Sequence, residues 1–585
     1  MSLLVWLPMT KDLSDQGLGG CTITNDGATL DNNGKLGKCY NFDGTNDRIL
    51  VSGLNKPKDI TIAFWLKRNA TTNTRQFLFT AWSGVSIELT TTNTIFGKVT
   101  FSSGEGGSAS GGTITADTGW VHVCYTFEDG VGGKIYINGQ LKASGDTTNS
   151  INWGSTTSGY IGNYSNIYLN GKLNDFRIYD HALSPREIEI LSRGLVAHYP
   201  LNGGGRGGDN ICTWGYYQSP RFANGAGTTK LTDTDYGEYR RYTCTTAGTS
   251  GGRYGYPVGQ TGALVQGNVY TWSAEFRANK QLSFTSSSYI GMEGGGILAG
   301  SDIKIDTEWR RLSKTWTQTT SQAFVLYPKD SVAVNDWIDM RNFKIEVGDK
   351  STPYIPSSSE SAYTAMGYNS TTEYDVSGYG NNMTKTGTIT YTSDSARYSV
   401  ASHFINGSYL MANQNCGEYL PKDSLTVNLW VKPATWGTPI SCTEGGGWNI
   451  ELSTNGLQFQ CYISSVGYKG ATSTVKASDL IDGKWHMLTG VFDRAAQQTK
   501  FYIDGELKGS NATGSTNGVG YANNRLIISG EAQSTTPASS TFVGEESDVR
   551  IYATALSATQ VAELYNTAVS VANNGTLMGY ELVEG

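Results

Sequence analysis

The chain has 585 residues, which is too many for one hydrophobic core and predicts three to four domains. It contains 73 glycines, 34 tyrosines and 14 tryptophans, and only 16% of its residues are charged. This composition excludes a helical enzyme or a disordered chain and is typical of an all-β protein with many turns. The formal net charge of −7 is modest and no basic stripe occurs, so we expect no nucleic-acid partner.

The N-terminal sequence MSLLVWLPM contains no basic segment, long apolar run or small-residue cleavage site. We therefore expect no signal peptide, no membrane insertion, and folding in a cytoplasm. The cysteines are scattered without CxxC pairs, at positions 21, 39, 124, 212, 244, 416, 442 and 461. We expect free thiols rather than disulfides or a zinc site, with Cys124 buried as a small hydrophobic residue.

The first third of the chain contains segments typical of β-strands. Buried strands are predicted at 59–67 (DITIAFWLK) and 118–127 (TGWVHVCYTF), and an alternating strand at 175–179 (DFRIY). Residues 134–142 (KIYINGQLK) predict a hairpin, because Asn-Gly supplies the positive φ of a type I′ turn.

A short helix is predicted after these strands. Ser184 is its N-cap, Glu187 completes a capping box, and Gly194 ends the helix. Residues 194–202 (GLVAHYPLN) are then similar to the opening segment 3–10 (LLVWLPMT), which predicts a second strand of the same kind.

The middle of the chain differs from the first third. Residues 268–278 (NVYTWSAEFRA) alternate apolar and polar side chains, and further strands are predicted at 307–318, 322–329 and 336–357. The alternation shifts phase within the last of these segments, which predicts a β-bulge.

Five segments of the first third recur in the same order in the C-terminal part. The pairs are 42–49 with 404–411, 59–67 with 423–432, 118–127 with 482–492, 134–142 with 500–508, and 171–191 with 544–564. Collinear matches of this length predict two copies of one all-β domain. The third pair places His122 over His486, and the second places Trp65 over Trp430.

The second copy is interrupted after its opening strand. In the first copy that strand continues into KDLSDQGLGGCTIT, whereas the matching EYDVSGYGNNMTKT begins only at residue 373. Insertion of the intervening domain at an exposed turn explains this displacement. The Gly-rich segment 203–209 and the segment 356–361 then serve as the two tethers.

The order F-D-G, I-x-F-W-x-K, G-W-x-H, Y-I-N-G-x-L and F-R-I-Y-x-x-A-L-S resembles the concanavalin A-like, laminin-G-type jelly roll over nearly all of 1–193 and most of 365–567. The resemblance implies two antiparallel sheets packed face to face, with the terminal helix covering one edge. That fold serves lectins, glycanases and structural spacers alike, so it does not decide the function.

The middle segment ends in I-D-M-R-N-F-K-I-E-V-G-D-K-S-T-P-Y-I-P and resembles the carbohydrate-binding modules attached to xylanases. Similar modules occur in tail proteins of phages of Gram-positive bacteria. We therefore predict an all-β chain with short capping helices. Its domains are a jelly roll (1–193), an inserted carbohydrate-binding-module-like β-sandwich (209–357), a discontinuous second jelly roll (194–208 and 358–568) and a C-terminal tail (569–585).

Catalytic residues are not expected. The jelly-roll glycanases carry E-x-D-x-E on one strand so that the acids face the sugar cleft, whereas the equivalent strands SIELTT and NIELST have one acid each, Glu88 and Glu451. No Ser-His-Asp order or nucleophile elbow occurs, and His122 and His486 follow a strand tryptophan, as packed residues of the fold do. The sequence therefore favours a protein that is not an enzyme.

A structural calcium ion is possible on fold grounds, because jelly rolls and xylanase-type modules often bind Ca²⁺ through carboxylate and backbone oxygens. Asp43 and Asp47 could supply such oxygens in the first jelly roll, and Asp336 or Asp339 in the middle module. Alternatively, these acids only hydrogen-bond the backbone of their own turns. The second copy has INGSYL at the place of the first pair and keeps no acid there.

Exposed aromatic rings are the best binding candidates, because the C–H face of a sugar stacks on a flat ring. Trp65, Trp272 and Trp430 lie in apolar strand patterns and are predicted to be core residues. The candidates near loops are Trp82, Trp214, Tyr216, Tyr217, Tyr254, Tyr256, Tyr289 and Trp448. Any of these rings could instead cap the edge of a core.

Three functions are compatible with these features. The first is a non-enzymatic virion protein, made in the host cytoplasm and released by lysis. It would be a receptor-binding or adhesin component of the tail, in many copies or as a homo-oligomer, that contacts other virion proteins and cell-surface glycan. The second is a head or tail decoration protein without specific glycan binding. The third is a carbohydrate-active enzyme or its binding subunit.

Overall fold

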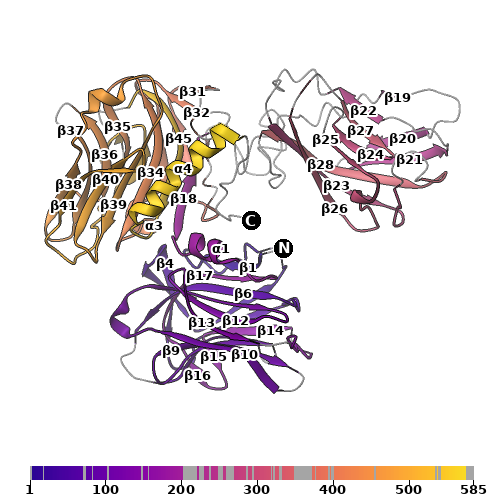
Figure 1. Ribbon diagram of the computed structural model, residues 1–585, viewed down its shortest axis with the longest axis horizontal. Coiled ribbons are helices and arrows are strands. Elements are labelled where there is room, and N and C mark those ends of the chain that lie inside the picture. The colour runs from indigo at the N-terminus through magenta and orange to yellow at the C-terminus, as the bar shows by residue number, and fades with distance from the viewer. Residues whose placement is uncertain are drawn as a thin grey trace.

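The computed structural model of the chain describes most residues between 3 and 574. The residues not described are 1–2, 18, 70–73, 82–83, 102–103, 147–148, 156, 202–220, 223–229, 236–238, 248–253, 258–268, 285–287, 293–295, 318, 320–322, 329–331, 348–371, 374, 376, 393–395, 397–400, 444, 454–455, 534–535, 538–541 and 575–585. Nearly all regular structure in the described part is strand, which confirms the all-β prediction (Figure 1). Pairs of large antiparallel sheets form three sandwiches, here called N-terminal, middle and C-terminal.

The N-terminal sandwich packs two sheets around one apolar core. One sheet contains, in order, β13 (Gln140–Asp146), β12 (Gly132–Ile137), β11 (Val121–Glu128), β6 (Ile60–Arg68), β17 (Asn170–Tyr179), β4 (Gly37–Asp43) and β3 (Thr29–Gly34), and β1 (Leu3–Leu7) pairs with β17. The other contains β10 (Gly104–Thr113), β9 (Thr94–Phe101), β8 (Val85–Leu89), β7 (Gln76–Ala81), β14 (Ser158–Ile161), β5 (Arg48–Ser52) and β2 (Thr22–Asp26). Phe79 and Phe176 meet between the sheets, with ring centroids 5.4 Å apart.

The C-terminal sandwich has the same plan. One sheet contains β31 (Ile389–Thr392), β32 (Ala401–Phe404), β45 (Gly544–Tyr552), β34 (Leu425–Pro433), β39 (His486–Asp493), β40 (Gln498–Ile503) and β41 (Glu506–Ala512), and β18 (Leu195–Tyr199) pairs with β45. The other contains β29 (Thr372–Glu373), β30 (Met383–Thr386), β33 (Tyr409–Asn415), β42 (Arg525–Ile528), β35 (Gly437–Ser441), β36 (Trp448–Ser453), β37 (Gly456–Ile463) and β38 (Gly467–Thr472). The strand that precedes the middle sandwich in the sequence therefore lies in a sheet of the C-terminal sandwich (Figure 1).

The middle sandwich is built from two five-stranded sheets. One contains β19 (Arg221–Phe222), β22 (Tyr254–Pro257), β27 (Ala323–Tyr327), β24 (Tyr289–Met292) and β25 (Gly296–Ala299), and the other β20 (Lys230–Asp235), β21 (Arg240–Thr246), β28 (Trp337–Val347), β23 (Val269–Ala278) and β26 (Arg310–Thr317). The predicted bulge lies in β28, where Asn342 has a φ of 52° and the register against β23 shifts.

Short elements complete the structure. Two small hairpins pair β15 (Asn163–Tyr164) with β16 (Ile167–Tyr168) and β43 (Ala532–Gln533) with β44 (Thr536–Pro537). The helices are α1 (Pro185–Leu191), α3 (Cys416–Tyr419) and α4 (Ala558–Asn574), with 3₁₀ turns at Ala116–Thr118, Gly300–Asp302 and Ala477–Leu480. The Ser184 and Glu187 side chains form the predicted capping box of α1. In the second copy Ser557 and Gln560 exchange the equivalent bonds at the start of α4.

The two laminin-type copies share an irregular feature at β17 and β45. Asp175 and Asp548 both have positive φ, 55° and 53°, which aspartate tolerates better than most residues. The amide of Asp175 donates to the carbonyl of Pro8 at 3.1 Å, and that of Asp548 donates to Pro200 at 3.2 Å. β1 and β18 thus occupy equivalent places in the two copies.

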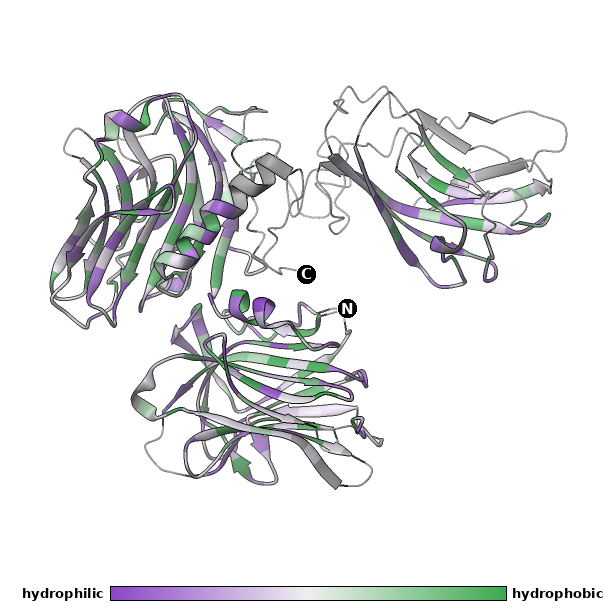
Figure 2. Cartoon of the chain, viewed as in Figure 1, coloured by the Kyte–Doolittle hydropathy of each residue, from purple (hydrophilic) through white to green (hydrophobic). Residues whose placement is uncertain are grey.

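Side chains alternate between core and surface as the sequence predicts, and Figure 2 shows this alternation along the strands. Phe176 and Ile178 lie in the N-terminal core, and Val549 and Ile551 in the C-terminal core. Cys124 is fully buried, and the seven cysteines in the described part of the chain are free thiols.

The N-terminal and C-terminal sandwiches are packed against each other. Trp65 is 2% exposed, as a core residue should be, but it lies on the outer face of its sheet and packs with the apolar cluster of the C-terminal sandwich. At the rim, Arg186 and Arg193 form ion pairs with Glu563 of α4 at 3.0 and 2.9 Å. Trp430 of the second copy is instead stacked on Tyr565 of its own α4, with centroids 5.6 Å apart.

Candidate functional site

The predicted binding aromatics do not gather in one place. Trp82, Trp214, Tyr216 and Tyr217 lie outside the described residues. Tyr254 and Tyr256 lie in β22, whose backbone pairs with β27, but the positions of their side chains are not described. Tyr289 is half-buried, and its ring stacks on Tyr327 with centroids 4.6 Å apart.

Trp448 is a correction. It was expected near a loop with an accessible ring, but it is 0% exposed and lies in the core of the C-terminal sandwich. Its indole nitrogen donates to the hydroxyl of Tyr521 at 3.2 Å. The residue is the first of β36 and faces inward, so no ligand can stack on it in this structure.

The calcium candidates have other partners. Asp43 and Asp47 accept backbone amides of their own turn, from Thr45 at 2.7 Å and from Asp43 at 2.8 Å, as the turn interpretation requires. Asp336 accepts the amide of Ala333 and pairs with Lys280 at 2.9 Å. Asp339 pairs with two arginines. Within the described residues, no three His, Cys, Asp or Glu side chains converge as a metal site would need.

The outer face of the sheet β20-β21-β28-β23-β26 presents a different arrangement. Tyr270, Trp272 and Phe276 of β23 point into the core of the middle sandwich, so Glu275 and Arg277 point outward. The strand register then sets Glu275 beside Arg341 and Arg311, and Arg277 beside Asp339 and Arg241. We call this surface the arginine–aromatic face; its residues are Tyr239, Arg241, Glu275, Arg277, Trp309, Arg311, Trp337, Asp339 and Arg341.

Each carboxylate of the face is shared between two arginines. Asp339 is 0% exposed and accepts from Arg241 at 2.7 and 3.0 Å and from Arg277 at 2.9 Å. Glu275 accepts from Arg341 at 2.7 Å and lies 3.9 Å from Arg311. Because a buried carboxylate fixes the guanidinium planes beside it, these arginines are held in defined orientations.

Aromatic rings lie against the same guanidinium groups. The guanidinium carbon of Arg241 is 3.7 Å from the ring centroid of Trp337. Those of Arg277 and Arg341 are 4.7 and 4.1 Å from the centroid of Trp309. Both tryptophans are half-buried, so part of each ring remains at the surface. The face combines flat apolar surface with planar hydrogen-bond donors.

The sequence analysis missed this face because it looked for rings near loops. Trp309 and Trp337 stand at the starts of strands, in TEWRRL and DWIDMR, next to arginines and acids. The signal was the opposite charge of residues on the polar side of alternating strands, which becomes a surface only when the strands pair.

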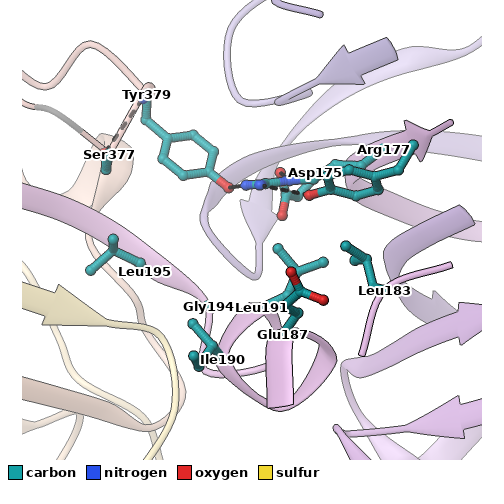
Figure 3. Close-up of a pocket in the computed structure, with 11 residues that line it drawn as sticks. Asp175, Arg177, Leu183, Glu187, Ile190, Leu191, Gly194, Leu195, Ser377 and Tyr379 are labelled. Atoms are coloured by element: carbon teal, nitrogen blue, oxygen red, sulfur yellow. Dashed lines mark hydrogen bonds and ion pairs between the residues drawn. The ribbon is translucent and has the colours of Figure 1, made fainter. Parts of the chain in front are cut away.

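A second polar site lies at the junction of the N-terminal and C-terminal sandwiches, where a pocket of about 460 Å³ opens to solvent. Figure 3 shows Tyr379 pointing its hydroxyl at Arg177, with Asp175 below and Leu191 across the pocket. Arg177 donates to Asp175 at 2.9 Å and to the hydroxyls of Tyr179 and Tyr379 at 3.4 Å each. Burial opposes the charge of Arg177, but Asp175 and the two tyrosines outweigh it and raise the pKa of Arg177.

The groups that line this pocket hold one another. Asp175 also accepts the indole N–H of Trp6 at 2.7 Å, and the Trp6 ring meets Tyr379 edge-on with centroids 5.6 Å apart. The network joins β1 and β17 to the segment that follows the middle sandwich in the sequence. We therefore interpret it as a structural link of the junction.

The geometry of the first and last sandwiches defines a class of antiparallel jelly rolls. Residues 43–189 and 404–562, together more than half of the chain, match the concanavalin A-like lectin/glucanases superfamily. The chain belongs to this family, which confirms the resemblance seen in the sequence. No curated protein matches the chain. In its described part, no helix has the length and apolar character to cross a bilayer.

Solved structures with similar folds include three binding proteins or domains. Domain 4 of AbnA, a GH43 extracellular arabinanase from Geobacillus stearothermophilus in complex with arabinotriose, is 23% identical, covers 32% of this chain and 98% of its own, and has a TM-score of 0.27. The receptor binding domain of botulinum neurotoxin D is 16% identical over 43% of this chain and 75% of its own, with a TM-score of 0.28. A SAP-like pentraxin from Limulus polyphemus is 20% identical over 27% and 75%, with a TM-score of 0.22.

Proposed function

We propose that this chain is a non-enzymatic attachment protein that binds cell-surface glycan through the arginine–aromatic face. The observation that carries the proposal is the placement of Trp309 and Trp337 beside oriented guanidinium groups on one strand-built surface. Indole rings stack on the C–H faces of sugars, and guanidinium N–H groups donate to sugar oxygens. Strands and buried carboxylates hold both in place, which lowers the entropy cost of binding.

Binding without hydrolysis is part of the proposal. A glycosidase needs two carboxylates on opposite sides of the scissile bond. Glu88 forms an ion pair with Arg75 at 2.5 Å, and Glu451 accepts from the amide of Gln458 at 3.1 Å. These bonds leave neither glutamate arranged as an acid or nucleophile toward a second carboxylate in the described strands.

We propose a virion as the location, with the protein present in many copies and attached to other virion proteins. The buried free thiols support folding in a reducing cytoplasm, and the middle segment resembles modules of phage tail proteins. Many copies on one particle would add weak sites into useful avidity. In this proposal the domains are 1–193, 209–357, and 194–208 with 358–568.

The experiment uses the full chain on an array of bacterial surface polysaccharides. A Trp309→Ala/Trp337→Ala variant should bind about tenfold more weakly, because two stacking contacts are lost. Trp436→Ala is the matched control, since Trp436 is 44% exposed in the C-terminal sandwich and should not matter. Thermal melts check that both variants fold, and a reducing-sugar assay should detect no release.

Two outcomes contradict the proposal. Unchanged binding by the folded double variant would place the contact elsewhere. Failure of the wild-type chain to bind any polysaccharide would favour a decoration role, and release of reducing sugar would make the chain an enzyme.

A further inference from the structure

We propose that the arginine–aromatic face selects acidic glycans, whose carboxylate or phosphate groups are bound by the terminal nitrogens of Arg277 and Arg341 beside Trp309. This inference rests on the proposed function, because it names the chemical class of glycan that the same face would take. It goes beyond ring stacking, which alone would accept neutral sugars.

The charge balance of the face is the first argument. Among its residues with described side chains, four arginines face two carboxylates, Glu275 and Asp339, and each carboxylate is shared between two guanidinium groups. Each cluster therefore retains one positive charge. The chain as a whole carries a net charge of −7, so the excess of cations here is a local property of the surface.

The donors available to a ligand are the second argument. Arg277 and Arg341 each give their Nε to a carboxylate, at 2.9 and 2.7 Å. Their terminal nitrogens make no hydrogen bond within the described part of the chain, and 29% and 33% of their side-chain surfaces are exposed. Terminal guanidinium nitrogens form a planar pair of donors that matches the two oxygens of a carboxylate or phosphate.

Trp309 places these donors together. Both guanidinium groups lie against its ring, and Tyr239 meets that ring edge-on with centroids 5.9 Å apart. An acidic group on a sugar ring could therefore reach a guanidinium while the sugar lies along the exposed part of the indole. A neutral glycan would gain the stacking contact but leave the positive charges unmatched.

The chemistry admits two sources of the anion, a uronic-type carboxylate and a phosphodiester. The test measures binding of the full chain to four immobilised probes: polygalacturonic acid, its fully methyl-esterified form, poly(glycerol phosphate) and neutral dextran. We expect binding at least about tenfold tighter to one or both acidic probes than to the neutral ones, because charge-assisted hydrogen bonds are stronger than neutral ones. We also expect this preference to weaken between low and high salt.

Variants separate the inference from a general charge effect. Arg277→Gln/Arg341→Gln should lose the acidic preference while keeping the residual stacking contact. Arg310→Gln is the matched control, because Arg310 is exposed in the same strand, pairs with Asp306 at 2.7 Å and lies outside the face. If the double variant unfolds in a thermal melt, Arg277→Lys/Arg341→Lys keeps the charges and should retain only part of the preference.

Each outcome decides one of the two proposals. Equal binding of acidic and neutral probes that depends on Trp309 and Trp337 would overturn this inference and leave the proposed function standing. Equal loss in Arg310→Gln, or single-stranded DNA bound as tightly as the acidic glycans, would show a nonspecific response to polyanions and also overturn it. Binding of none of the probes, together with no binding on the polysaccharide array, would overturn the proposed function itself.

Discussion

The amide of His122 donates to the side-chain oxygen of Asn138 at 2.9 Å, and at the same place in the second jelly roll the amide of Met487 donates to Asp504 at 2.8 Å. Asn138 and Asp504 both begin the tight turn of a hairpin, with φ of 50° and 51°. His122 is thus equivalent to Met487 and not to His486, which corrects the alignment expected from the sequence by one residue. The two histidines therefore have different environments and should respond to pH in opposite directions.

His122 should make the N-terminal sandwich sensitive to acid. Burial lowers the pKa of His122 to about 4, and its ring lies 5.2 Å from that of Trp65. A histidine with a folded-state pKa below its unfolded value contributes stability above pH 6.5 that is lost as the pH falls toward 4. The free energy of unfolding should fall by roughly 3 kcal/mol across that range. Urea denaturation at several pH values measures this loss.

The matched variant is His122→Met, which installs the residue of the second copy. It should remove most of the loss between pH 6.5 and pH 4 while the protein still folds at pH 7. A loss of the same size in the variant would assign the acid sensitivity to another group.

His486 should act in the opposite sense in the C-terminal sandwich. Hydrogen bonds and charge from Asp504, at 2.9 Å, and from Asp482, at 3.2 Å, raise the pKa of His486. A raised histidine pKa gives stability that is present below pH 6.5 and lost as the pH rises through the folded-state value. Thermal melts at pH 6 and pH 8 should show this loss in the wild type and not in His486→Gln. A titration of the His486 ring by NMR with a midpoint below 6.5 would contradict the prediction.

Asp175→Asn should destabilise the junction between the sandwiches. Asparagine tolerates the positive φ of this position, so the change removes the charge without straining the backbone. It leaves Arg177 buried without its carboxylate, and breaking a buried ion pair costs about 3–5 kcal/mol. Chemical denaturation of the full chain measures the cost.

Two further variants test the cause of that effect. Adding Arg177→Met should recover part of the lost stability, because the unpaired charge is then removed. Asp306→Asn, which breaks the exposed pair with Arg310, should change stability little. Equal effects of Asp175→Asn and Asp306→Asn would show that burial of the pair does not matter.

The sequence could predict the features that depend on neighbouring residues. The capping box at Ser184, the type I′ turn at Asn138 and the bulge near Asn342 are local signals, and the structure contains all three. Alternation also separated Trp272, which is buried, from the outward residues of its strand. The collinear repeat then fixed the jelly-roll fold, because two copies of one pattern specify one domain twice.

Features that depend on pairing between distant strands could not be predicted in the same way. Arg277 meets Asp339 and Arg241 only because three strands far apart in the sequence lie side by side. Trp448 was placed near a loop because Gly residues precede it, yet its direction is set by pairing with β37. Trp65 was expected inside one sandwich, but a neighbouring sandwich covers it, which no local pattern reveals.

Glu546 is the position where the second jelly roll departs most clearly from the first. It pairs with Val431 and Ser402, as Leu173 pairs with Leu66 and Tyr40, so it occupies an inward position filled by leucine in the first copy. It is 0% exposed, and neither carboxylate oxygen has a hydrogen-bond partner within the described residues. Burial raises the pKa of Glu546 well above its usual value.

Glu546→Leu should therefore stabilise the C-terminal sandwich. A buried polar group without a partner costs about 1–3 kcal/mol, and leucine has a suitable volume at the equivalent place. Because the folded-state pKa of this acid is raised, its wild-type stability is greatest below pH 4.3 and is lost as the pH rises toward the folded-state value. The variant should unfold at a higher urea concentration at pH 7 and depend less on pH. Glu545→Leu, one residue earlier on the half-buried side facing His403, is the control and should give no such gain. A wild-type chain that is more stable than Glu546→Leu at pH 7 would show that the carboxylate has a stabilising partner.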